Sequence, residues 1–158
     1  MKIAPRDRVL KIINNLKIEK LPFKVNSENL GKLGLDIAKD IKEIFQLLDT
    51  SQSLKWAFST VKKAKIFVII YTANENGNLI YKEEISKLLP EYSYKTIATI
   101  IDEGISKGYY VELDPKVDDV KDKKIKNIRP SIELITSFYN WSLARISNVS
   151  NLIKKYEE

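Results

Sequence analysis

Apolar residues recur every three or four positions along most of this chain, and that spacing is typical of amphipathic helices. In the N-terminal third, the pattern predicts one helix over residues 5–18 and another over residues 27–48. Gly31 and Gly34 weaken the first turns of the second helix, so we expect its firm part to begin near Leu35.

A third helix is predicted over residues 54–74, with Ser53 placed to cap its first turn. Three lysines near its middle, at positions 62, 63 and 65, are interpreted as a solvated face. Asn76 and Gly77 then mark a turn, after which residues 78–81 have the composition of a short strand.

Two short helices separated by a tight turn are expected next. The first covers residues 82–89 and ends at Pro90, and the second runs from Tyr94 to about Lys107. Ser93 is placed to cap the second helix by accepting a hydrogen bond from a backbone N–H. The residues expected to face inward are Ile85, Leu88 and Leu89 on the first helix and Ile97, Ile101 and Ile105 on the second.

A β-hairpin with a charged tip follows. Gly108 ends the preceding helix, and the two strands are predicted over residues 109–113 and 124–129. Helix, turn, helix and hairpin in this order make up a winged helix-turn-helix, which lays its second helix in a DNA groove. The predicted fold class is therefore mainly α with a small β-hairpin, a winged helix-turn-helix flanked by long N- and C-terminal helices.

A long helix from Ser131 to about Lys155 closes the chain. Its apolar residues alternate at spacings of three and four, as in a coiled-coil seam, and others widen the seam to more than one face. The second face indicates a homodimer, and the alternative is a helix that folds back onto its own N-terminal helices. The seam comprises Ile132, Ile135, Tyr139, Ser142, Ile146, Val149, Ile153 and Tyr156, and the wider face adds Leu134, Phe138, Trp141 and Leu152.

The composition narrows the chemistry. The 158 residues include neither cysteine nor histidine, which removes thiolate and imidazole zinc sites, cysteine nucleophiles and Ser-His-Asp triads. We therefore expect no enzyme activity, cofactor or metal. No apolar run approaches the roughly 18 residues of a membrane span, and the charged N-terminus is unlike a signal peptide. These features favour a cytoplasmic protein without a membrane partner.

The formal net charge is +6, but the positive charge is unevenly placed. Residues 1–24 contain seven Lys or Arg against two acids, whereas residues 82–129 contain ten against ten. Such a neutral module can bind DNA only if its cations face the phosphates and its carboxylates face away. The basic N-terminal arm either packs on the protein or a partner, or touches phosphate.

Candidate DNA contacts lie on two surfaces of the predicted module. The outward face of the second helix presents hydroxyl and lysine groups in its N-terminal turns, where such groups reach base edges and phosphates. These residues are Ser93, Tyr94, Lys95, Thr96 and Thr99. The hairpin tip presents lysines to the DNA backbone or minor groove, namely Lys121, Lys123, Lys124 and Lys126.

The same stretch resembles the DNA-binding core of the multiple-antibiotic-resistance regulator (MarR) family of winged helix proteins. The spacing of that family's recognition helix is matched without gaps by Ser93, Thr96-Ile97, Ile100-Ile101, Asp102 and Lys107-Gly108-Tyr109. The family's wing, an Asp followed by basic residues, is matched by Asp122-Lys123-Lys124, and Ser131 then caps the last helix. Two departures are Gly104, where the family prefers Leu, and Lys for Arg in the wing.

The resemblance covers the chain from Leu54 onward and implies a dimeric, sequence-specific transcriptional regulator that binds double-stranded DNA. Its recognition helix, Ser93–Lys107, would enter the major groove, and its wing, Asp114–Arg129, would lie on the backbone or minor groove. The resemblance also implies a possible small-molecule effector. Four aromatic residues either line its pocket or are plain core, namely Trp56, Phe67, Tyr71 and Trp141.

Three domains are expected on this basis. Residues 1–53 form an N-terminal helical dimerisation segment, residues 54–130 the winged helix DNA-binding domain, and residues 131–158 a C-terminal dimerisation helix. The alternative is a winged-helix module that binds protein and no DNA, and the neutral charge of residues 82–129 favours it.

Overall fold

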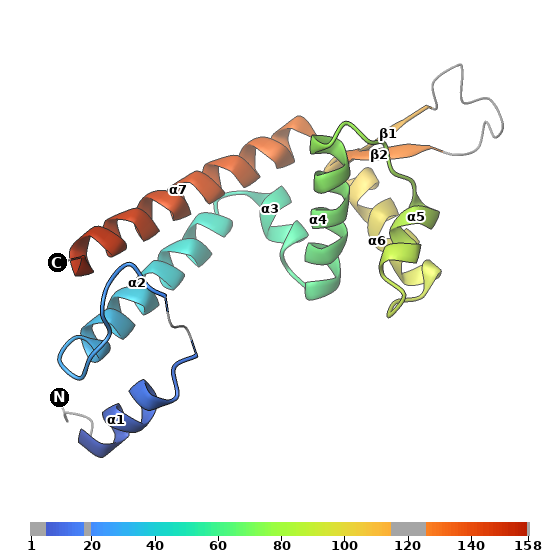
Figure 1. Cartoon of the computed structure of the whole chain (residues 1–158). Helices are drawn as coiled ribbons and strands as arrows, with labels where there is room; N and C mark the ends of the chain where they lie inside the picture. The colour runs from blue at the N-terminus through green and yellow to red at the C-terminus, as the bar shows by residue number, and fades with distance from the viewer. Residues whose placement is uncertain (1–5, 18–19, 115–125, 158) are drawn as a thin grey trace. The chain divides into compact units, whose positions relative to one another are not determined.

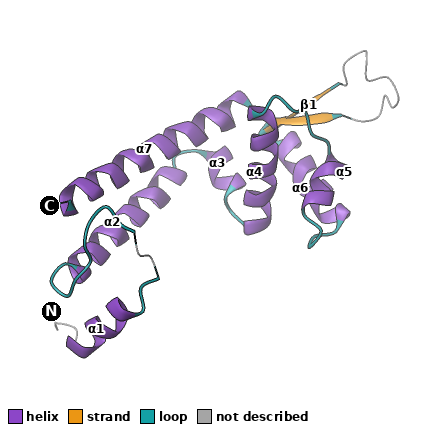
Figure 2. Cartoon of the chain, in the orientation of Figure 1, coloured by secondary structure: helices purple, strands orange, loops and turns teal. Residues whose placement is uncertain are grey.

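The computed structural model describes residues 6–17, 20–114 and 126–157. Within these ranges the chain forms seven helices and one two-stranded antiparallel sheet (Figure 1), and Figure 2 shows how far the helices predominate. The predicted fold class, mainly helical with a small hairpin and a long C-terminal helix, is confirmed. In chain order the elements are α1 (Arg6–Asn14), α2 (Leu30–Leu48), α3 (Gln52–Ala57), α4 (Val61–Glu75), α5 (Lys82–Leu88), α6 (Tyr94–Ser106), β1 (Tyr110–Leu113), β2 (Asn127–Pro130) and α7 (Ile132–Tyr156).

The chain folds into two compact units. One consists of Met1–Leu47 together with Trp141–Glu158, and we call it the terminal unit; the other, Leu48–Asn140, is the winged unit. Helix α7 contributes to both, since its residues up to Asn140 belong to the winged unit. The functional division of the chain at residues 54 and 131 stays a prediction. In the described part of the chain, no helix has both the length and the apolar character that crossing a membrane requires.

The winged unit has a continuous apolar core. Every helix in it, together with the hairpin, contributes side chains that are at most 6% exposed. Burial on this scale is the main source of stability for a domain of this size. The buried apolar residues are Leu54, Ala57, Ile66, Phe67, Ile70, Ile80, Ile85, Leu89, Ile97, Ile101, Tyr110, Ile128 and Leu134.

The hairpin pairs β1 with β2 in an antiparallel register that sets Tyr110 opposite Pro130 and Leu113 opposite Asn127. The strand predicted over residues 78–81 is reduced to a single bridge, in which the Ile128 N–H donates to the Ile80 carbonyl at 2.8 Å. This bridge ties the segment before α5 to the inner strand of the hairpin.

One close contact fixes α6 against the hairpin and α3. Gly104 is buried in α6, and a Cβ added there would lie 2.8 Å from Cε2 of Tyr110 and 2.9 Å from Cη2 of Trp56. The Tyr110 ring is itself 1% exposed, and burial raises the pKa of its hydroxyl. The departure from the family's Leu at position 104 is therefore explained, because only glycine leaves room for the two rings.

The helix predicted over residues 54–74 is wrong as a single element, because the chain breaks between α3 and α4. Ser51, not Ser53, caps α3 by accepting a backbone N–H at 3.2 Å, and Ser53 is buried inside the helix. Thr60 caps α4 in the same way at 3.2 Å, and the Ser59 hydroxyl donates to a carbonyl of α3 at 2.7 Å. These side chains satisfy the backbone groups that a continuous helix would otherwise pair.

Two smaller predictions also need correction. The helix predicted over residues 27–48 begins at Leu30 and is already regular through Gly31 and Gly34, ahead of Leu35, where its firm part was expected to begin. The Asn26 side chain accepts two backbone N–H groups at 2.9 and 3.0 Å and organises the turn before it. Leu88 was expected to face inward but is 60% exposed. Leu89, which was also expected to face inward, leaves the helix with φ −126° and ψ 63° and is buried, as predicted.

The terminal unit has a small apolar core. Among its described residues, only Leu33 and Ile44 are buried apolar side chains. Helix α2 and the C-terminal part of α7 are joined by polar contacts: Asp36 accepts hydrogen bonds from Lys155 at 2.8 Å and from Tyr156 at 2.5 Å. Many large apolar side chains of this unit are at least 37% exposed, namely Leu10, Ile12, Leu16, Leu21, Leu35, Ile37, Ile41, Phe45, Leu143, Ile146 and Val149.

The contact around Gly104 gives a stability prediction. Gly104→Ala should lower the free energy of unfolding by about 1–2 kcal/mol, because overpacking costs about 1–3 kcal/mol and outweighs the helix propensity gained. Gly34→Ala is the matched control, since that helical glycine has nothing within 4 Å of an added Cβ. It should stabilise the protein by about 0.5–1 kcal/mol. Chemical denaturation followed by circular dichroism measures both changes, and a stabilising Gly104→Ala would contradict the packing described.

Candidate nucleic-acid interface

Helix α6 has one face in the core and the other exposed. Ile97 and Ile101 are fully buried, as predicted, and α5 contributes the buried Ile85 beside them. The turn between α5 and α6 is closed by the Tyr92 N–H, which donates to the Leu89 carbonyl at 3.1 Å. The two helices therefore present the N-terminal turns of α6 at the surface of the winged unit.

Ser93 determines where α6 begins, and its predicted role as a cap is confirmed. Its backbone is extended, at φ −68° and ψ 151°, and its hydroxyl oxygen accepts the Thr96 N–H at 3.2 Å. At the other end, Gly108 has a φ of 77° and its N–H donates to the Ile105 carbonyl at 3.0 Å, so the helix ends where the sequence predicts. A helix N-terminus carries a partial positive charge, so the Ser93 end favours anions.

We call Ser93, Tyr94, Lys95, Thr96 and Thr99 the α6 ridge. All are exposed except Thr96, which is half-buried. The Ser93 and Thr96 hydroxyls lie 2.9 Å apart, so one of them donates a hydrogen bond to the other. The Thr99 hydroxyl donates to the Lys95 carbonyl at 2.7 Å. One of the three hydroxyl protons therefore remains for an outside acceptor, and the oxygens keep lone pairs for outside donors.

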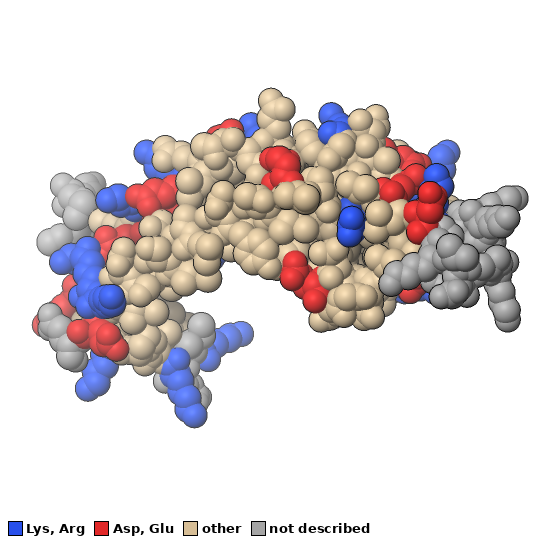
Figure 3. All heavy atoms as spheres, turned by 90° about the horizontal axis from the view of Figure 1, so that it is seen from above, with Lys and Arg blue, Asp and Glu red and all other residues tan. Residues whose placement is uncertain are grey.

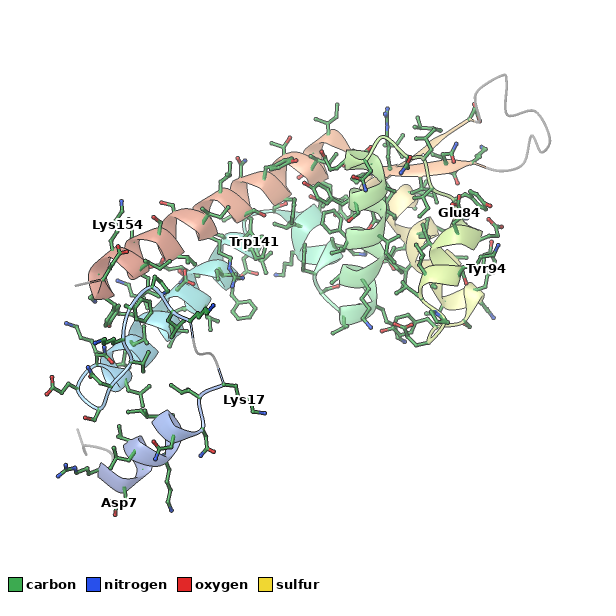
Figure 4. All side chains as sticks on the ribbon, in the orientation of Figure 1. Asp7, Lys17, Glu84, Tyr94, Trp141 and Lys154 are labelled. Atoms are coloured by element: carbon green, nitrogen blue, oxygen red, sulfur yellow. The ribbon has the colours of Figure 1, made fainter. Side chains whose placement is uncertain are left out.

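The two larger side chains of the ridge, Tyr94 and Lys95, differ in whether they are bonded to the rest of the protein. The Tyr94 hydroxyl donates to Glu83 Oε1 at 3.2 Å, which ties the ring to α5, and Figure 4 shows Tyr94 at the α5–α6 pair. Burial, and then the Glu83 carboxylate, raise the pKa of Tyr94. No described carboxylate lies within 4.0 Å of the Lys95 ammonium, so its three N–H donors are available to a ligand.

Carboxylates on α6 are paired with lysines from other elements. Asp102 accepts from Lys82 at 2.5 Å; burial lowers the pKa of Lys82, but the hydrogen bond and charge of Asp102 raise it overall. Glu103 accepts from Trp56 Nε1 at 2.6 Å and lies 3.7 Å from the Lys63 ammonium. The Trp56 hydrogen bond, followed by the charge of Lys63, lowers the pKa of Glu103. These pairs offset the negative charge of α6, whereas Glu83 of α5, which accepts the Tyr94 hydroxyl, has no lysine within 4.0 Å among the described residues.

The sequence predicted that the three lysines of α4 form a solvated face, but two of them form ion pairs within the protein. Lys63 has only 18% of its side chain exposed, and its ammonium lies 4.8 Å from the centre of the Trp56 ring. Lys65 pairs with Glu91 of the α5–α6 turn at 3.0 Å. The Lys65–Glu91 pair joins residues 26 positions apart and the Lys63–Glu103 pair joins residues 40 positions apart, so no local sequence signal indicates them.

The wing is described only in its two strands. The Lys126 ammonium, from the residue directly before β2, lies 3.6 Å from Glu112 of β1, and the Arg129 side chain is exposed. The other predicted wing contacts, Lys121, Lys123 and Lys124, lie outside the described residues. On the face shown in Figure 3, Lys and Arg are interspersed with Asp and Glu and separated by uncharged residues.

The aromatic residues considered for an effector pocket have packing partners. In the winged unit the Phe67 ring is fully buried and lies 5.8 Å from Tyr71 and 5.3 Å from Phe138, between ring centres. The ring centres of Trp56 and Tyr109 lie 5.4 Å apart. In the terminal unit, Trp141 Nε1 donates to a carbonyl of α2 at 3.3 Å. These contacts fit the plain-core interpretation, and the small-molecule effector stays a prediction.

Comparison with known proteins adds little. No protein-family model and no curated protein matches the sequence. Among solved structures, the crystal structure of the YusO protein from Bacillus subtilis aligns with a TM-score of 0.47 and 15% sequence identity, covering 81% of this chain and 83% of that chain. That degree of likeness carries no argument about function, which has to rest on the site itself.

The cap at Ser93 is separable from any role in binding. Ser93→Ala should lower the free energy of unfolding by about 1 kcal/mol, because the Thr96 N–H loses its acceptor. Ser93→Asp keeps an acceptor at the same place and should recover most of that loss. Chemical denaturation checks both variants. Equal stability of the Ala variant and the wild type would show that the cap contributes nothing.

Proposed function

We propose that the protein is a transcriptional regulator that binds double-stranded DNA as a homodimer and recognises a specific sequence. Helix α6 lies in the major groove, and the wing lies on the backbone or minor groove. The observation that carries this proposal is the exposed α6 ridge, in which hydroxyl groups and a lysine without a carboxylate partner among the described residues stand at the positive end of a helix.

The pairing of carboxylates supports DNA as the ligand. Residues 82–129 have no net charge, but Asp102, Glu103 and Glu91 are each paired with a lysine. Two of those lysines, Lys63 and Lys65, come from α4, outside that stretch. The ridge can therefore approach phosphates without unpaired negative charge on α6 opposing it.

The resemblance of residues 93–109 to the recognition helix of the MarR family supports the same function. The pattern from Ser93 to Gly108 is that of a family whose members bind DNA through this helix. In this chain two residues of the apolar steps, Ile97 and Ile101, are buried and Ile100 is half-buried, while the polar residues of the pattern are exposed except Thr96, which is half-buried. In the alternative, a module that binds only protein, the ridge is a solvated surface.

The terminal unit supports the homodimer. With two buried apolar side chains and a long series of exposed ones among its described residues, it lacks the core that a unit of this size needs. On α7 the exposed members include Ile146, at 64%, and Leu143, at 60%. A homodimer carries two α6 helices, which can then meet two half-sites about 34 Å apart.

The first test of this function is sequence preference. The wild-type chain should recover a common motif from a random duplex library at low salt. Lys95→Ala combined with Thr96→Ala should lose that preference, since each good base contact discriminates by about 1–3 kcal/mol.

Lys55→Ala is the control, because Lys55 is an exposed lysine on α3, paired with Asp49 at 3.0 Å and outside the ridge. It should select the same motif as the wild type. Absence of duplex binding by the wild type at low salt would refute the proposal and leave the protein-binding alternative.

The second test is the dimer. Ile146→Glu should convert the protein to a monomer at micromolar concentration, because a charge cannot be buried unpaired in an apolar interface. Ile146→Leu keeps the apolar surface and should remain a dimer. Sedimentation equilibrium measures both, and a wild-type monomer, or a dimer that Ile146→Glu leaves intact, would contradict the interface.

A further inference from the structure

Two lysines of α4 meet the turn between α5 and α6. The Lys62 ammonium lies 5.4 Å from the centre of the Tyr92 ring, and the Lys65 ammonium lies 5.5 Å from the same centre. Both distances are within the range of cation–π attraction, which orients an ammonium group over the ring. From the sequence, these lysines are interpreted as a solvated face.

One carboxylate lies in this cluster. Glu91 accepts from Lys65 at 3.0 Å, and its own backbone N–H, followed by Lys65, lowers its pKa. The pair leaves Lys62 as the cation without a carboxylate partner within 4.0 Å among the described residues. The cluster of Lys62, Lys65, Glu91 and Tyr92 therefore carries one net positive charge.

The position of the cluster is set by the chain itself. Tyr92 is bonded directly to Ser93, the cap of α6, and the ridge begins at that residue. When a recognition helix enters the major groove by its N-terminal turns, the phosphates of the strand that borders the groove lie beside that end of the helix. An ammonium group held at Tyr92 is then close to those phosphates.

We propose that Lys62 and Lys65, oriented by Tyr92, form a phosphate-binding site on α4 that anchors the protein to the DNA backbone next to α6. This inference rests on the proposed function and adds residues that lie outside the helix-turn-helix and the wing. Lys62 contacts the phosphate directly. The phosphate and Glu91 compete for the Lys65 ammonium, so Glu91 lowers the affinity of the site for phosphate.

Substitutions at Lys62 and at Glu91 should change the affinity for DNA in opposite directions. Lys62→Ala removes a phosphate contact, so it should weaken binding alike to the selected duplex and to an unrelated one. The slope of log K against log salt should fall in magnitude by about 1. Glu91→Gln removes a negative charge and releases Lys65, so it should tighten binding to both duplexes.

The measurement is a salt titration of the full chain with both duplexes by fluorescence anisotropy, with Lys55→Ala as the control that keeps the wild-type slope. Thermal unfolding of each variant confirms that it is folded. A purely structural role for the Lys65–Glu91 pair predicts that Glu91→Gln weakens binding.

Both a reduced slope for Lys62→Ala and tighter binding by Glu91→Gln are required. If the wild type selects a motif but either result fails, the α4 site is overturned and the proposed function stands. If the wild type binds no duplex at low salt, both are overturned.

Discussion

The contact of two aromatic rings with a bare helix backbone determines the arrangement of the winged unit. Tyr110 and Trp56 lie against Gly104, where any side chain would overlap them. This contact joins α6 to the hairpin and to α3, so the orientation of the exposed face of α6 follows from it. A rigid element behind the binding residues is what lets a polar ridge keep one geometry.

Charge pairing across elements is the second constraint. The stretch from α5 to the end of the hairpin has no net charge, and a neutral surface would not by itself attract a polyanion. The structure pairs Glu91 and Glu103 with lysines of α4, so α4 belongs electrostatically to the surface that α6 presents. Such exposed pairs add little stability, and their effect lies in the local charge that a ligand meets.

Sequence signals within a few residues were sufficient to predict α6, the helix that carries the candidate site. The Ser93 cap, the apolar spacing of Ile97 and Ile101, and Gly108 at the helix end each depend on residues within a few positions, and all three are confirmed. The break between α3 and α4 was missed, although Thr60 is a good capping residue, because the apolar pattern continues across it.

Tertiary contacts were not accessible from the sequence. In the sequence Gly104 is only a departure from the Leu that the resembled family prefers, and the reason for it is seen only when Tyr110 and Trp56 are placed beside it. The pairing of Lys63 with Glu103, 40 positions away in the sequence, likewise depends on the packing of α3, α4 and α6. Residues 115–125, with three of the four predicted wing lysines, lie outside the described part of the chain.

The most direct measurement of whether the α6 ridge faces DNA is photocrosslinking from a benzophenone side chain introduced at position 94, in place of the exposed Tyr94 ring. The same group at position 55 on α3 provides the comparison. Crosslinks to duplex DNA from position 94 and none from position 55 are the predicted result. Equal crosslinking from the two positions, or none from position 94 at low salt, would contradict it.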